Sequence, residues 1–89
     1  MKWQELSSPR LDAVDRNTPV ILNMAAMEQH GPHLPLDTDA LIGRHFTGRI
    51  DTELGDQVLI LPQLPVCCSR HHMAYAGTLT VRDETFLAY

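Results

Sequence analysis

The stretch "TPVILNMAAM", residues 18–27, decides the fold class of this 89-residue chain. From Val20 to Ala26 it is apolar almost without interruption over the length of one strand, and such runs are typical of strands buried on both faces of a parallel sheet. A second run, "DQVLILPQLP" at residues 56–65, has the same character and ends at a proline. The two runs predict two buried core strands.

Helices are expected on either side of the first strand. In "SSPRLDAVDRN", residues 7–17, Ser8 is the expected N-cap and Pro9 the first helical residue. The longer segment at residues 38–55 begins at Asp37 or Thr38 as a cap and stops at a glycine. Its apolar side chains recur at i, i+4 spacing, which predicts one stripe that the helix must bury. The stripe consists of Ile42, Phe46, Ile50 and Leu54.

Two shorter elements complete the pattern. "GTLTV" at residues 77–81 is expected to form a short strand, and "RDETFLAY" at residues 82–89 begins another helix. Strands that alternate with helices, without hairpin signals, favour an α/β fold of three layers, α/β/α, with a mainly parallel sheet. Because such a sheet needs several strands covered on both faces, residues 1–89 are expected to form a single partial domain.

Composition and charge exclude several classes of function. The net charge of -4 and the lack of any Lys or Arg run leave no basic surface for nucleic acid. The start, "MKWQELSSPRLDAVD", has no uninterrupted apolar stretch and is therefore neither a signal peptide nor a membrane span. Two adjacent cysteines are no disulfide framework, which favours the cytoplasm.

The loop "EQHGPHLPLDTD", residues 28–39, joins the first strand to the long helix and holds the candidate site. Ligands of open α/β folds bind at this edge of the sheet. Glu28 and His30 leave one face of an extended chain, and Asp39 returns at the start of the helix. The three could converge on a divalent cation, and an Asp can bridge two cations. Capping and solubility remain the alternative, with Asp37 and Asp39 as rival helix caps.

The same loop closely resembles the N-terminal signature of the creatininase (creatinine amidohydrolase) family. The resemblance continues through "VLILPQLPVCCSRHHMAYAGTLTVRDETF", with its proline-flanked loop, its Ser-x-x-His step and its Gly-Thr strand. It implies the N-terminal portion of a three-layer α/β/α amidohydrolase that binds two divalent metal ions, zinc and/or manganese. It also implies a homo-oligomer, often a hexamer.

Carried over by position, the resemblance implies that Glu28 ligates one metal, His30 the other, and that Asp39 bridges them. A water activated by the two cations would then attack the carbonyl carbon of a small cyclic or linear amide and break its C–N bond. The family's remaining ligands, a His and a Glu, belong to a later segment that these 89 residues do not include. The chain alone is therefore expected to be inactive.

Three further residues are possible pocket residues. Ser69 and His72 match the family's Ser-x-x-His step, and His33 can support a ligand from the loop, although solvent-facing positions are equal alternatives. His71 has no family counterpart, and His45 is expected on the polar face of the long helix.

The two adjacent thiols, Cys67 and Cys68, are interpreted as small packing residues. Neighbouring cysteines rarely bridge, because disulfide geometry strains the peptide between them. A metal or redox role is the less favoured alternative.

Two classes of function stay open. The first is a metal-dependent amidohydrolase of the creatininase family, acting on a substrate that the sequence does not identify. The alternative is a catalytically inert, truncated piece that serves as a binding or assembly module. A downstream His and Glu in the same reading frame would distinguish the first from the second.

Overall fold

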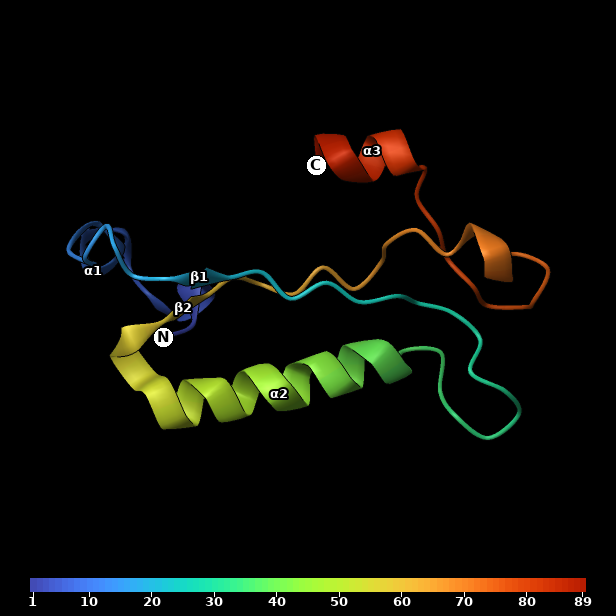
Figure 1. The fold of residues 1–89 in the computed structure, drawn as a ribbon, viewed down its shortest axis with the longest axis horizontal. Helices are drawn as coiled ribbons and strands as arrows, with labels where there is room; N and C mark the ends of the chain where they lie inside the picture. Colours follow the sequence, from blue (N-terminus) through green and yellow to red (C-terminus); the bar gives the residue numbers. More distant parts are fainter.

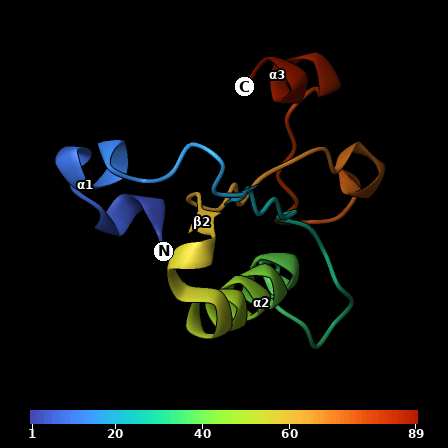
Figure 2. The same cartoon turned by 60° about the vertical axis from the view of Figure 1, so that its left-hand side comes forward.

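A computed structural model describes all residues from Met1 to Tyr89. Two short strands, β1 (Val20–Ile21) and β2 (Leu59–Ile60), lie side by side toward the left of Figure 1, and α2 runs below them and the extended segments that follow. In both views α2 and α3 lie on opposite sides of the extended segments (Figures 1 and 2). The helices are α1 (Ser8–Asp12), α2 (Thr38–Leu54) and α3 (Asp83–Ala88), with 3₁₀ turns η1 (Trp3–Glu5), η2 (Gly55–Gln57) and η3 (Arg70–His72).

The sheet is parallel, as expected, but small. Val20 lies opposite Leu59 and Ile21 opposite Ile60. Single bridges extend the pairing, parallel between Met24 and Leu64 and antiparallel between Met27 and Leu79. The result is a mixed α/β arrangement around a two-stranded parallel sheet, so the α/β class is confirmed and the three-layer form stays a prediction. The expected strand at residues 77–81 is reduced to the bridge at Leu79.

The N-terminus adds an anchor beside β2. The amide of Ile60 donates to the carbonyl of Met1 at 2.8 Å. The Met1 ammonium donates to the carbonyl oxygens of Gly55 at 2.6 Å and Val58 at 2.9 Å, and pairs with the Asp51 carboxylate at 2.9 Å. The start of the chain therefore clamps the end of α2 to the sheet.

The helix boundaries follow the sequence signals closely. Asp37 occupies the N-cap position of α2, although its side chain makes no capping hydrogen bond, and Gly55 ends the helix with a φ of +54°, a conformation that favours glycine. The predicted cap of α1 was wrong by one residue, since Ser7 is the cap and Ser8 the first helical residue. Pro9 fits the second position because the first turn has no partner for its missing N–H anyway.

The core is thin, and two burial predictions were wrong. Only eight of the 89 residues are buried. The first apolar run is covered on one face only, because Val20, Leu22 and Met24 are each about half exposed on the other. Likewise most of the apolar stripe of α2 faces outward, since Ile42, Phe46 and Leu54 are exposed and only Ile50 is partly buried. The structure contains nothing that covers either surface.

Small residues of α2 pack on the strands instead. Ala40 is 1% exposed. At Gly43 a Cβ atom would lie 2.6 Å from the Asn23 side chain and 2.8 Å from the Gln63 side chain. The helix thus approaches the sheet closely through a face that has almost no apolar bulk.

The molecule is extended for its size. Its radius of gyration is 15.6 Å, whereas a compact domain of this length has about 12 Å. Its accessible surface is 6460 Å², against about 5,200 Å² for a folded monomer of this mass. None of the helices combines the length and apolar composition that a bilayer-spanning segment needs.

Candidate metal centre

The loop between β1 and α2 folds back on itself and brings its two ends together. The Glu28 amide donates to the Leu36 carbonyl at 3.1 Å, which closes the loop. Gly31 turns the chain with a φ of +80°. The first turn of α2 follows at once, so Asp39 returns to the neighbourhood of Glu28.

Glu28, His30 and Asp39 converge as the sequence spacing suggested. One ligand atom from each lies within 4.8 Å of the others. The Nε2 atom of His30 is 3.1 Å from Oδ1 of Asp39, close to the separation of about 3.4 Å that two ligand atoms have around tetrahedral zinc. Carboxylate oxygens and imidazole nitrogen suit zinc or manganese. The donor set therefore fits a divalent cation, and the role of these residues as metal ligands stays a prediction.

The electrostatics of His30 favour a positive charge in this position. Its Nδ1 lies 3.0 Å from the Glu28 carbonyl oxygen, and its Nε2 faces the Asp39 carboxylate. Only the doubly protonated ring can donate to both. The backbone hydrogen bond to Glu28, opposed by desolvation and assisted by Asp39, therefore raises the pKa of His30 above 6.5. A cation bound at Nε2 would replace that proton.

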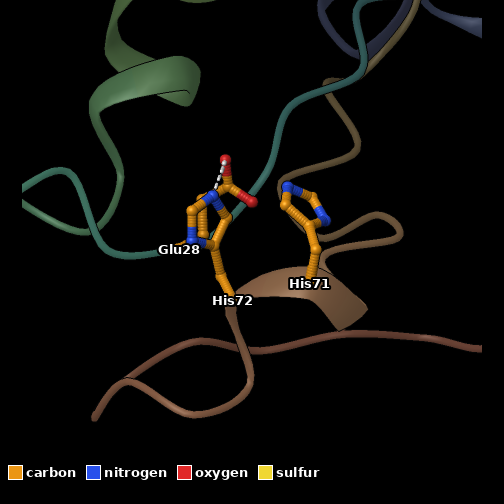
Figure 3. Close-up of side chains that lie close together, drawn as sticks. All are labelled: Glu28, His71 and His72. Carbon is orange, nitrogen blue, oxygen red and sulfur yellow. Dashed lines mark ion pairs between the residues drawn. The ribbon is translucent and has the colours of Figure 1, made fainter.

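A second group of side chains reaches Glu28 from η3. Figure 3 shows His71 and His72 extending from this turn toward the Glu28 carboxylate. The Nε2 atom of His72 is 3.9 Å from Oε1 of Glu28, and the two histidine rings are 4.3 Å apart. These three residues also offer ligand atoms within 4.8 Å of one another. Glu28 is thus common to two clusters.

The segment after Gly77 holds η3 in place. The Leu79 amide donates to the Met27 carbonyl at 2.8 Å, directly before Glu28. The amide of Gln29 donates to Oγ1 of Thr78 at 3.3 Å, and that of Ser69 to Oγ1 of Thr80 at 2.9 Å. The η3 turn and the Glu28 segment therefore share one support.

The possible pocket residues have different placements. Ser69 is fully buried at the N-cap of η3, and its Oγ has no hydrogen-bond partner. His72 is half-buried beside Glu28, whereas His33 is exposed in the loop. His45 is exposed on α2, as expected. None of the five main surface hollows is lined by Glu28, His71 or His72.

The thiols of Cys67 and Cys68 are free and partly buried. Desolvation raises the pKa of both thiols above the usual value, which keeps them protonated. This supports the interpretation that they are packing residues.

Sequence reasoning missed Gln29 and His71. Gln29 lies between two predicted ligands and bonds to Nδ1 of His72 at 3.0 Å and to the Gly31 amide at 3.0 Å. No sequence signal distinguishes it from an ordinary loop glutamine. His71 was noted but left without a role.

Comparisons with known proteins agree with the sequence resemblance. The family model for creatininase, described as creatinine amidohydrolase, matches residues 4–89. A mycofactocin precursor peptide peptidase from Mycobacterium tuberculosis is 33% identical over 89 positions, covering 90% of this chain and 36% of the relative. The protein of the same name from Mycolicibacterium smegmatis is 32% identical over 66 positions, covering 70% of this chain and 27% of the relative. The chain thus spans about a third of the length of the curated relatives it matches.

Proposed function

Because the chain belongs to the creatininase family, we propose that it carries the first part of a metal centre that hydrolyses amide C–N bonds. The observation that carries this proposal is the convergence of Glu28, His30 and Asp39 on one point after β1. The relatives named as peptidases act on a peptide, so the substrate class that we propose is a peptide or another amide.

Each residue has a distinct part in this proposal. A bound divalent cation supplies a water of lowered pKa and polarises the substrate carbonyl. His30 offers its Nε2 lone pair, because Nδ1 is held by the Glu28 carbonyl. Asp39 offers two oxygens from the first turn of α2, and Glu28 supplies a further carboxylate from a side chain that is only 14% exposed. Further ligands would come from outside these residues.

The test is zinc titration of the 89-residue chain by calorimetry, with two matched histidine variants. His30→Gln removes a proposed ligand, and His45→Gln removes an exposed histidine of α2 with no role in the centre. We expect weak zinc binding that falls about tenfold or more in the first variant and is unchanged in the second. Equal affinities in both variants would contradict the metal centre.

Amidase activity is the second measurement. Two protein ligands for each of two cations are fewer than the three that catalytic zinc usually has. We therefore expect no useful hydrolysis by this chain alone, and loss of activity in a full-length relative when the matching Asp is replaced by Asn. An amide bridges two cations poorly because it is neutral and offers only one oxygen. Full activity of that variant would remove Asp39 from the bridging role.

The exposed apolar surfaces favour a second candidate, an assembly module. Phe46 and Ile42 on α2 are 59% and 51% exposed, and Val20 on β1 is 55% exposed. Apolar patches of this kind mark interaction sites in folded proteins. We propose homo-oligomers as the form in which these faces are covered. An assembly that forms and persists without any effect of zinc or of His30→Gln would favour this candidate over the hydrolase.

A further inference from the structure

Two imidazoles flank Glu28, and their hydrogen-bond partners differ. The Nδ1 atom of His30 lies 3.0 Å from the Glu28 carbonyl oxygen, which can only accept. Its Nε2 faces a second acceptor, the Asp39 carboxylate, at 3.1 Å, so a cation that takes the place of the Nε2 proton would leave the other ring proton on Nδ1. This is the form that binds a cation.

His72 is held in the other form. The Gly31 amide, which can only donate, lies 3.0 Å from Oε1 of Gln29. This contact fixes the orientation of the Gln29 amide, so its nitrogen is the end that faces Nδ1 of His72 at 3.0 Å. That nitrogen donates, Nδ1 accepts, and the ring proton of His72 belongs on Nε2.

The Nε2–H of His72 points toward the Glu28 carboxylate but does not reach it. The separation of 3.9 Å is too long for a hydrogen bond, and Figure 3 shows the two groups facing each other. We propose that Gln29 is a positioning residue that keeps His72 as a donor, and that His72 donates a hydrogen bond to the carbonyl oxygen of the amide substrate beside Glu28. This inference rests on the proposed function.

The rival arrangement is a cation held by Glu28, His71 and His72, whose ligand atoms are also close together. A cation at Nε2 of His72 would move the ring proton to Nδ1, directly against the amide hydrogens of Gln29. Turning the Gln29 amide would relieve that clash but would take the acceptor away from Gly31. His71 is exposed, and no hydrogen bond orients its ring. The chemistry thus disfavours His72 as a ligand.

The first test reads the position of the ring protons. Long-range ¹H–¹⁵N spectra of the chain should show the proton of the neutral His72 ring on Nε2 and, with zinc bound, a proton on Nδ1 of His30. In Gln29→Glu the new carboxylate can only accept, both from the Gly31 amide and from Nδ1 of His72. The proton of the His72 ring should therefore move to Nδ1. Gln29→Met removes the restraint, and the His72 signals should become those of a free imidazole. A neutral His72 ring with its proton on Nδ1 in the wild type would overturn the proposal.

The second test reads zinc affinity and separates this inference from the metal centre itself. His72→Gln should change the affinity by less than about twofold, whereas His30→Gln should lower it about tenfold or more. In Gln29→Glu the affinity should rise, and His72→Gln should abolish that rise, because His72 has then become a ligand. A loss in His72→Gln equal to that in His30→Gln would refute the donor role. No loss in either variant would refute the metal centre.

Discussion

Gly77 offers a sharp test of how the two halves of the site are held together. Its φ is +84°, and a Cβ atom added there would lie 2.5 Å from Cδ1 of Leu36. In Gly77→Ala the left-handed backbone costs about 1–2 kcal/mol. The clash adds about 1 kcal/mol, at the low end for overpacking because Leu36 is 38% exposed and can rotate. We expect Gly77→Ala to lower the stability of the folded loop by about 2–3 kcal/mol in total.

Gly31→Ala is the matched control. Gly31 has nearly the same φ, +80°, but a Cβ atom there would meet nothing within 4 Å. This variant should therefore be destabilised only by the left-handed backbone, which costs about 1–2 kcal/mol. The difference between the two variants isolates the contact between Gly77 and Leu36.

The assay is native-state hydrogen exchange at the Glu28 amide, which donates to the Leu36 carbonyl and reports opening of the loop. A loss of about 1–2 kcal/mol in stability speeds exchange about fivefold to thirtyfold. The Glu28 amide should therefore exchange about another fivefold faster in Gly77→Ala than in Gly31→Ala. Equal acceleration in the two variants, or a larger effect at Gly31, would refute the packing of Leu36 over Gly77.

Three further outcomes are expected. Asp39→Asn should weaken zinc binding about tenfold or more, as measured by calorimetry, and unchanged affinity would contradict its place in the centre. The hydrogen bond from the N-terminal ammonium lowers the pKa of Asp51 in the folded protein. The ionised Asp51 therefore contributes its full stabilisation above about pH 4, the pKa of an unfolded Asp, and this contribution is lost as the pH falls through the lower pKa of the folded state. Acid titration followed by circular dichroism should therefore be less steep for Asp51→Asn, and identical curves would argue against the pair. The chain should be oligomeric, molten or prone to aggregate, and Phe46→Glu should reduce association in light scattering, whereas a sharply melting wild-type monomer would show this to be wrong.

The sequence predicted the local structure best where a chemical signal marks a boundary. Asp37 stands at the N-cap position of α2, where polar residues are favoured, and Gly55 ends the helix because a residue tolerant of positive φ is needed there. The convergence of Glu28, His30 and Asp39 was also foreseen, since the turn residues and the helix start fix the path of the loop.

Burial was predicted less well, for a physical reason. The spacing of Ile42 and Phe46 shows that they share a face, but periodicity does not say which face meets the sheet. Here α2 lies so close to Asn23 that only small residues fit between them, and Ala40 and Gly43 therefore form the face of the helix that packs on the strands. Long-range contacts were also beyond the sequence pattern, since no spacing rule brings His72 to Gln29 across 43 positions.

The anchored N-terminus has a practical consequence for handling the protein. The Met1 ammonium donates to two carbonyl oxygens and pairs with Asp51, and a peptide fused before it would replace that ammonium with a neutral amide bearing a single N–H. An affinity tag at this end would therefore loosen the junction between α2 and β2. Tyr89, at 89% exposure, is the better point of attachment for a tag, a fluorophore or a surface linker.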